Sequence, residues 1–337
     1  MKMHCSLGER SYDIVLERGC LLDISEYLDC NRRYFIISDT GVPKEIIMSI
    51  RTQLKDANVF LVAEGETSKC METYQMCLKM MLQKKYTRND CVIALGGGVV
   101  GDLAGFVASS YMRGIDFINI PTTTLAQIDS SIGGKVAIDM DGIKNCVGAF
   151  WQPKLVLIDP NVLKTLPRRH FYNGLVEALK AGLIGDETLF EIFEKEDYLD
   201  YLDEILQRSL EIKRNVVEAD EKETGLRKIL NFGHTIGHGI ESAAHFHDYY
   251  HGECVGLGML AILEDKDIKQ RVKRVLEKMH CPVQHHLDPK EIYKYIANDK
   301  KADGKSITIV QVSKIGEALL IEKSIDELER NCHEENI

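Results

Sequence analysis

Residues 91–106 read CVIALGGGVVGDLAGF, and this stretch decides which fold the chain adopts. An apolar run, a glycine cluster and a second apolar run predict a buried strand, a tight loop and a helix. Gly96, Gly98 and Gly101 match the pattern GxGxxG, in which backbone N–H groups at a helix start approach a pyrophosphate. A glycine turn that only packs shares this pattern. The loop also follows a late strand and not the first, unlike the ordinary dinucleotide-binding fingerprint, so both interpretations stay open.

The segments around this loop alternate between strand-like and helical patterns. Strand-like runs SYDIVLER, RYFIISD and NVFLVAE accompany the helical PKEIIMSIRTQLKDA, and LVLIDP follows at 155–160. This alternation predicts helices packed on a sheet. Asp39 ends one run, and an acid at a strand's carboxyl end accepts hydrogen bonds from ribose hydroxyls, which favours NAD over NADP. A turn-forming Asp before Thr40 and Gly41 is the alternative.

The segment FINIPTTTLAQIDSSIGGKVAID, at 117–139, predicts a buried strand that runs into a loop of hydroxyls and glycines. Such loops at strand ends often form ligand sites. Three cations, Arg113, Lys135 and Lys144, lie in or beside this segment among small and apolar residues. In an acidic chain this set indicates an anionic ligand. Each cation taken singly is equally compatible with an ordinary solvated side chain.

Helical patterns dominate after Pro167, which marks the expected domain boundary. In FYNGLVEALKAGLI, Glu177 and Lys180 share one face of an otherwise apolar helix, so they form an internal ion pair or bind a ligand. The remaining periodic segments predict a solvated amphipathic helix at 186–206, helices at 204–228 and 265–279, and a hairpin after the basic pair Lys300 and Lys301.

The stretch LNFGHTIGHGIE, at 230–241, is the richest in chemically active side chains. His234 and His238 stand four apart and therefore share one helical face, an arrangement that suits a metal ligand beside a proton-transfer group. Packing of a histidine in a glycine-rich helix crossing is the alternative. His251 begins a small-residue helix, as a ligand from a neighbouring helix would. His245 and His247 are expected to be more exposed.

Composition narrows the classes of function. With 337 residues and 45% hydrophobic content, the chain is long enough for two globular domains. A net charge of -10 argues against nucleic acid as a partner. No apolar run approaches the ~20 residues of a membrane helix, and the start lacks the apolar core of a signal peptide. We therefore expect a cytoplasmic protein that binds no membrane. Its ten cysteines form no CxxC pair, which predicts reduced, mostly packed thiols.

The blocks GGGVVGDLAGF, YMRG, IPTTTLAQIDSSIGGK, KNCVGAFWQP, NGLVEALKAGLI, DEKETGLRKILNFGHTIGH and HGECVGLGM occur in an order and spacing that resemble the 3-dehydroquinate synthases. This family of sugar-phosphate cyclases is similar in fold to glycerol and iron-dependent alcohol dehydrogenases. The resemblance implies an N-terminal NAD-binding α/β domain over residues 1–167. It implies a mainly helical metal- and substrate-binding domain over 168–337, with the active site between the two.

Carried over by motif, the resemblance implies a site residue at each matching position. The implied ligands of Zn²⁺ or Co²⁺ are Glu177, His234 and His251, which removes His238 from the ligands and makes it an acid-base or phosphate contact. Glu223 matches a proton-transfer residue. The implied substrate residues are Arg113, Asp129, Lys135, Lys144, Asn145, Lys180, Lys213, Arg227, Asn231 and one of Lys300 and Lys301. The implied NAD residues are Asp39, Glu66, Lys69, Gly97, Gly98, Val99, Asp102, Thr122 and Thr123. The segment VAIDMDG departs from the asparagine and proline of many members.

The reaction implied by the resemblance converts 3-deoxy-arabino-heptulosonate 7-phosphate to 3-dehydroquinate and phosphate in the shikimate pathway of aromatic amino acid biosynthesis. It proceeds by transient oxidation by NAD, phosphate elimination, re-reduction and internal aldol closure, which makes the enzyme a carbon-oxygen lyase. The expected partner is a second copy in a homodimer. Three alternatives remain: a 2-deoxy-scyllo-inosose synthase, whose substrate lacks the carboxylate, a metal- and NAD-dependent polyol dehydrogenase, and a non-enzymatic NAD-binding regulator.

Overall fold

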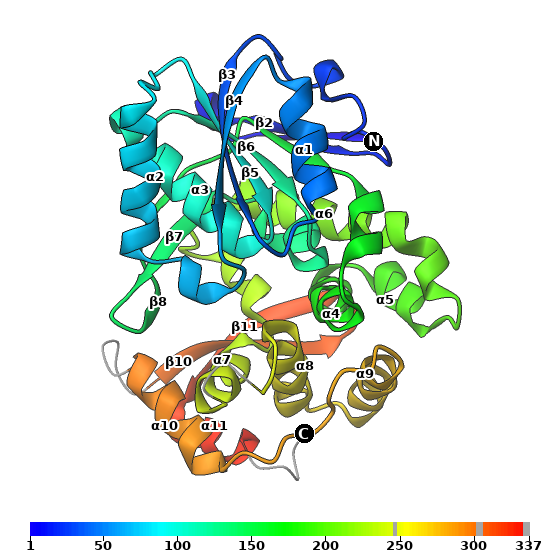
Figure 1. Ribbon diagram of the computed structural model, residues 1–337. Helices are drawn as coiled ribbons and strands as arrows, with labels where there is room; N and C mark the ends of the chain where they lie inside the picture. The colour runs from blue at the N-terminus through cyan, green and yellow to red at the C-terminus, as the bar shows by residue number, and fades with distance from the viewer. Residues whose placement is uncertain (245–247, 301–305, 333–337) are drawn as a thin grey trace. The chain divides into compact units, whose positions relative to one another are not determined.

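The computed structural model describes residues 1–244, 248–300 and 306–332. The chain forms two compact units, Met1–Pro167 and Arg168–Ile337. The first unit is built on a sheet with covering helices, and the second is mainly helical (Figure 1). This confirms the predicted fold class of an α/β half followed by a mainly α-helical half. None of the helices in the described ranges has the length and apolar character that a membrane crossing requires.

The first unit is organised around one seven-stranded sheet with the order β1-β2-β9-β6-β5-β3-β4. All neighbours pair in parallel except β1 and β2, which are antiparallel. Parallel strands covered on both faces have nearly continuous apolar runs. This explains why the strand segments could be distinguished from the helical segments in the sequence. The strands are β1 (Lys2–Cys5), β2 (Tyr12–Leu16), β3 (Arg33–Asp39), β4 (Asp56–Val62), β5 (Cys91–Gly96), β6 (Asp116–Pro121) and β9 (Leu155–Ile158).

Helices cover both faces of this sheet. Alternate side chains of β3 enter two different cores: Tyr34 and Ile36 pack in one, Phe35 and Ile37 in the other. The first core includes α1 (Lys44–Gln53), and the second includes α2 (Met71–Gln83) and α3 (Gly98–Ser110). Figure 1 shows α1 on one side of the sheet and α2 and α3 on the other. The predicted succession of strand, glycine loop and helix at 91–106 is confirmed.

The segment expected to be a loop of hydroxyls and glycines contains regular structure. A single π-helical turn, η5 (Ala126–Ser130), follows β6. The antiparallel pair β7 (Lys135–Met140) and β8 (Ile143–Phe150) then forms a separate two-stranded sheet. This hairpin packs on α3, where a Cβ added to Gly105 would lie only 2.3 Å from Val136 Cγ1. The prediction of a loop was therefore wrong from Lys135 onward, because β8 supplies β7 with a strand partner.

The second unit consists of eight α-helices, two 3₁₀ helices and one hairpin within the described residues. The expected hairpin is confirmed as the antiparallel pair β10 (Ser306–Lys314) and β11 (Glu317–Ser324). The α-helices are α4 (Arg168–Gly185), α5 (Glu187–Glu194), α6 (Leu202–Ala219), α7 (His234–Ala243), α8 (His251–Ile262), α9 (Lys266–Lys278), α10 (Pro289–Lys300) and α11 (Ile325–Asn331).

All ten cysteines of the chain are free thiols, and all but Cys30, Cys70 and Cys146 are buried, as predicted.

Two predicted helices are wrong in extent. The single solvated helix expected at 186–206 is instead α5, a short 3₁₀ turn and the start of α6, and α5 buries a full apolar face that includes Phe190 and Phe193. The helix expected at 204–228 ends at Ala219. The carboxylate of Asp220 accepts hydrogen bonds from the backbone N–H groups of Thr224, Gly225 and Arg227, which closes a loop.

Candidate active site

The central helix of the second unit carries a buried acid and a buried base. Every residue of α4 from Tyr172 to Ile184 is buried. Within it, the Glu177 side chain is 2% exposed and that of Lys180 is 4% exposed. Lys180 Nζ donates a hydrogen bond to Glu177 Oε2. The other oxygen, Oε1, is buried and has no hydrogen-bond partner among the described residues. Glu177 is thus in an ion pair and still offers one oxygen to a ligand.

Glycine contacts bring α7 and α8 together at short range. A Cβ at Gly258 would lie 2.0 Å from the carbonyl oxygen of Gly233, and one at Gly237 would lie 2.8 Å from that of Cys254. Gly233 also has φ 77, which L side chains rarely adopt. Larger residues at these positions would therefore separate the two helices. The close packing places His251, the first residue of α8, beside the histidines of α7.

Three donor atoms from three helices converge in this region. His234 Nε2 and His251 Nε2 each lie 3.6 Å from the unpartnered Glu177 Oε1. Donor atoms of these three residues all lie within 4.8 Å of one another. Two imidazole nitrogens and one carboxylate oxygen form a donor set that suits Zn²⁺ or Co²⁺ with a coordination position left for a substrate. The buried, unpartnered oxygen at the centre of the set is what a bound cation would satisfy.

Hydrogen bonds on the far side of each ring fix how the histidines face this point. His234 Nδ1 lies 3.1 Å from the carbonyl oxygen of Phe232. His251 Nδ1 lies 3.3 Å from Glu241 Oε2. In the neutral ring each acceptor favours the tautomer with a proton on Nδ1, which leaves Nε2 available to a cation held beside Glu177. The sequence interpretation overlooked Glu241, although it follows His238 by three positions and so lies on the same helical face.

Two of the three donors, Glu177 and His234, are in the protonation state that binds a cation, and the third, His251, has to lose a proton first. Burial would raise the pKa of Glu177, but Lys180 and the two histidines hold that pKa well below its usual range, so the carboxyl is ionised. Burial and the nearby Lys180 lower the pKa of His234 well below its usual value, so this ring is neutral. Burial would lower the pKa of His251 too, but Glu177 and Glu241 raise it to about 9.

His238 belongs to a second, more exposed group. Its ring centroid lies 5.3 Å from that of His234 and 5.8 Å from that of His251. Donor atoms of His238, Glu241 and His251 also lie within 4.8 Å of one another. Among the described residues, neither group of close donors contains both His234 and His238. The spacing in the sequence thus placed the two histidines on one face but did not identify their partners.

The remaining candidate residues of the second unit lie on two neighbouring elements. Lys213 is buried on α6, and Arg227 is buried on the 3₁₀ helix η8 (Leu226–Asn231). Arg227 Nη1 donates to the carbonyl oxygen of Glu221 at 2.5 Å. Asn231 Nδ2 donates to Glu223 Oε1 at 2.8 Å.

Some predicted site residues lie at the end of a described range or outside the described residues. Lys300 is the last residue of α10. His245, His247 and Lys301 lie outside the described residues.

The glycine loop of the first unit joins β5 to α3. Gly97 is the residue before α3, and the helix start has no side-chain cap. A Cβ at Gly97 would lie 3.0 Å from Thr123 Cγ2, and one at Gly98 would lie 3.1 Å from Ser130 Oγ. Close packing therefore accounts for these glycines, and the first-turn N–H groups around Val99 also suit a pyrophosphate. Both interpretations of the loop remain compatible with the structure.

Hydroxyl and acid side chains surround the same sheet edge. Asp39 Oδ1 accepts hydrogen bonds from the N–H groups of Gly41 at 2.8 Å and Val42 at 3.2 Å, so the turn-forming role is realised. Thr122 is buried after β6. Thr123 Oγ1 accepts a hydrogen bond from the N–H of Ala126 at 3.2 Å and so supports the π-helical turn.

Lys69 lies among four polar side chains of the first unit. Its side chain is 4% exposed, and its ammonium lies 2.8 Å from Glu66 Oε1 and 3.2 Å from Asp102 Oδ2. Lys69 Nζ also donates to Asn145 Oδ1 at 2.7 Å and lies 3.8 Å from Asp139 Oδ1. Burial would lower the pKa of Lys69, but the surrounding carboxylates raise it. Burial raises the pKa of Asp102 to about 6 despite the attraction of Lys69. Asp139 was not predicted.

The four other candidates of the first unit are spread over separate elements. Arg113 is exposed, with φ 69, at the end of a short 3₁₀ turn. Asp129 lies in the π-helical turn. Lys135 is exposed at the start of β7, and Lys144 is half-buried in β8. Asn145, another substrate residue predicted in this unit, contacts the predicted nucleotide residue Lys69.

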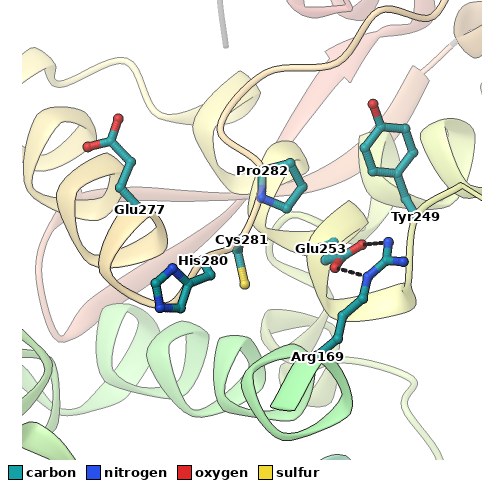
Figure 2. Close-up of a pocket in the computed structure, with 7 residues that line it drawn as sticks. All are labelled: Arg169, Tyr249, Glu253, Glu277, His280, Cys281 and Pro282. Carbon is teal, nitrogen blue, oxygen red and sulfur yellow. Dashed lines mark hydrogen bonds and ion pairs between the residues drawn. The ribbon is translucent and has the colours of Figure 1, made fainter. Parts of the chain in front are cut away.

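A cavity of about 520 Å³ lies elsewhere in the second unit. Figure 2 shows Arg169 paired with Glu253 through two contacts, at 2.7 and 2.8 Å. None of Glu177, His234 and His251 lines it, so this cavity is separate from the converging donors. Its lining residues are Arg169, Tyr249, Glu253, Glu277, His280, Cys281 and Pro282.

Comparison with known proteins identifies relatives over nearly the whole chain. The family models described as 3-dehydroquinate synthase N-terminal and C-terminal match residues 59–173 and 174–302. A 3-dehydroquinate synthase of Enterococcus faecalis is 42% identical over 97% of both chains. Another, from Clostridium beijerinckii, is 38% identical over 95% of this chain and 97% of its own.

Two solved structures are similar in fold. A 2-deoxy-scyllo-inosose synthase complexed with carbaglucose-6-phosphate, NAD⁺ and Co²⁺ is 25% identical, with a TM-score of 0.88 over 100% of both chains. The 2-epi-5-epi-valiolone synthase of Streptomyces hygroscopicus, with NAD⁺ and Zn²⁺ bound, is 29% identical, with a TM-score of 0.85 over 97% of both chains.

Proposed function

Because the chain belongs to the 3-dehydroquinate synthase family, we propose that it converts 3-deoxy-arabino-heptulosonate 7-phosphate to 3-dehydroquinate and phosphate. In this reaction the enzyme is a carbon-oxygen lyase that uses NAD catalytically and requires a divalent metal ion. The observation that carries the proposal is the convergence of Glu177, His234 and His251 in a chain 42% identical to a 3-dehydroquinate synthase.

The donor set fits the metal ions seen in the structural neighbours, Co²⁺ and Zn²⁺. When bound, the metal ion polarises a substrate oxygen, and NAD takes up and later returns a hydride. Glu177 and the Nε2 atoms of His234 and His251 would hold the ion. Lys180 keeps Glu177 ionised and neutralises its charge within the buried helix.

Buried cations of the second unit suit a substrate with two anionic groups. Arg227 is 2% exposed and Lys213 is 7% exposed, and charged donors in such a setting bind carboxylate and phosphate groups strongly. We assign them to the carboxylate and phosphate of the substrate, together with Asn231. The Glu223 carboxylate, which accepts a hydrogen bond from Asn231, would move a proton. His238, exposed beside His251, would contact the phosphate or act as an acid-base group.

The first unit would hold the cofactor. The start of α3, with Gly97, Gly98 and Val99, would receive the pyrophosphate. Asp39, Asp102 and the Glu66–Lys69 pair would contact or support the ribose and nicotinamide groups, with Thr122 and Thr123 at the neighbouring strand end. Further substrate contacts would come from Arg113, Asp129, Lys135, Lys144 and Asn145.

The assay for this function uses the purified protein, the heptulosonate phosphate, Zn²⁺ or Co²⁺ and NAD at far below the substrate concentration. We expect one inorganic phosphate per 3-dehydroquinate and many turnovers per NAD, with no accumulation of NADH at 340 nm. Stoichiometric NADH with no phosphate would instead identify a dehydrogenase. Turnover of glucose 6-phosphate, and not of the heptulosonate phosphate, would identify the activity of the 2-deoxy-scyllo-inosose synthase neighbour.

Two further expectations stay predictions: assembly as a homodimer and location in the cytoplasm. Sedimentation equilibrium of the full chain tests the first directly, since a dimer has twice the 38.1 kDa of the monomer.

A further inference from the structure

We propose that Asp139 is a positioning residue, which together with Lys69 fixes Asn145 for the substrate and ties the β7–β8 hairpin to the nucleotide-binding residues. The roles of Asn145, Glu66 and Asp102 in this inference rest on the proposed function. The contacts that hold these residues together are all within the first unit.

The hairpin is irregular at the point where Asn145 lies. Ile138 pairs with Val147 and Met140 pairs with Ile143, so a single residue of β7, Asp139, faces residues 144–146 of β8. Such bulges turn a side chain away from the regular alternation and are common beside active sites. Asn145 has φ 55, a left-handed conformation that asparagine tolerates better than most L residues. The bulge therefore aims Asn145 in a direction that a regular strand would not allow.

Asp139 supplies the contacts that maintain this conformation. Its Oδ1 accepts a hydrogen bond from the backbone N–H of Asn145 at 2.8 Å. Its own backbone N–H donates to the carbonyl oxygen of Lys69 at 2.8 Å. Asp139 is thus attached by its backbone to the segment before α2 and by its side chain to the bulge.

Lys69 completes the link from the other side. An ammonium has three N–H donors, and three oxygens lie within 3.2 Å of Lys69 Nζ, those of Glu66, Asp102 and Asn145. They come from the 3₁₀ turn η3 (Glu66–Ser68), from α3 and from β8. One buried ammonium therefore joins two residues assigned to the cofactor with one assigned to the substrate.

Loss of Asp139 should change the position of Asn145 without changing the stability of the fold. Asp139 and Asn145 lie in the two-stranded sheet, and neither belongs to the two apolar cores, although Val136 and Ile138 of the same hairpin pack in the second core. Loss of the Asp139 carboxylate removes one acceptor from the left-handed Asn145 and leaves those cores unchanged. The expected consequence is a misplaced Asn145 side chain and weaker substrate binding in a folded protein.

The experiment compares Asp139→Ala, Asp139→Asn and the matched control Asp141→Asn. Asp141 is exposed in the turn of the same hairpin and also has a left-handed φ, which asparagine tolerates. We expect Asp139→Ala to raise the KM for the heptulosonate phosphate about tenfold, the equivalent of one lost hydrogen bond, with kcat within about threefold of the wild type. Asp139→Asn keeps an acceptor oxygen and should restore KM to within about threefold.

Amide hydrogen exchange supplies a readout that does not depend on activity. We expect the Asn145 amide to exchange about tenfold faster in Asp139→Ala than in the wild type or in Asp141→Asn. Unchanged KM and unchanged exchange in Asp139→Ala would overturn the proposal. If that variant does not fold, Asp139→Asn still decides, because a tenfold higher KM in this folded variant would contradict a role as acceptor. If the wild type releases no phosphate, the proposed function fails, and the exchange rates still test the positioning.

Discussion

Replacing Glu177 by glutamine separates its two roles, as partner of Lys180 and as donor to a cation. The substitution keeps the shape of the side chain but removes its charge, and it leaves Lys180, 4% exposed, as a buried ammonium without its counter-charge. Breaking a buried pair from one side costs about 3–5 kcal/mol of unfolding free energy. Solvent screens the attraction between these two charges very little, since both side chains are almost fully buried.

A second substitution tests that magnitude. In the double variant Glu177→Gln with Lys180→Met, no unpaired charge remains, and replacing both partners of a buried pair is often close to neutral. We therefore expect the double variant to recover most of the stability lost in Glu177→Gln. It should not recover metal binding, because the anionic donor is still missing. The control is Glu196→Gln, whose side chain is 96% exposed.

The assay is urea unfolding of each variant with and without Zn²⁺. At a free metal concentration of one hundred times its Kd, the wild type should gain about 2.7 kcal/mol of unfolding free energy. Neither Glu177 variant should gain a measurable amount at that concentration. The reasoning is refuted if Glu177→Gln binds Zn²⁺ as tightly as the wild type, or if the double variant is no more stable than the single one.

Three further predictions test other parts of the account. Glu241→Ala should weaken Co²⁺ binding about 10- to 100-fold in a spectroscopic titration, because the His251 ring loses its outer acceptor; unchanged affinity would contradict this role. Gly258→Ala would place a Cβ 2.0 Å from a carbonyl oxygen of α7, so thermal unfolding should show a loss of at least about 1–3 kcal/mol together with weaker metal binding. Hydrogen bonds from Arg271 lower the pKa of Glu194, so this pair contributes stability above the unfolded-state pKa and loses it as the pH falls through the lower folded-state value. Arg271→Leu should therefore cost about 1 kcal/mol or less at pH 7 and less still at pH 3, measured by urea unfolding at both pH values.

The sheet of the first unit could be predicted because buried parallel strands leave a local signal. A run such as residues 91–96 is apolar throughout and is followed by glycines, so its strand is visible without knowledge of its neighbours. The hairpin of β7 and β8 leaves no such signal. Residues 143–150 have only exposed and half-buried positions, and the hairpin packs on α3 through β7. A bulge opposite Asp139 further breaks the period-two pattern.

The metal donors illustrate the same limit. The spacing of His234 and His238 shows that both lie on one helical face, but the structure groups the first with Glu177 and the second with Glu241, with His251 common to both groups. Glu177 and His251 come from other helices, and their approach depends on the glycine contacts between α7 and α8. The residues themselves suggested His251 as a ligand and left Glu177 as ion-paired or ligand-bound, and the family resemblance joined both to His234. The helix expected through residue 228 was wrong because a single carboxylate, that of Asp220, closes the loop after Ala219.

The central claim is that Glu177, His234 and His251 hold one divalent ion, and X-ray absorption at the zinc edge of the Zn²⁺-loaded protein tests it most directly. The account predicts a first shell of oxygen and nitrogen at about 2.0–2.1 Å with the scattering of two imidazoles. His234→Ala should lose one of these imidazoles or lose the metal. A spectrum with sulfur at about 2.3 Å, or one that His234→Ala leaves unchanged, would contradict the account.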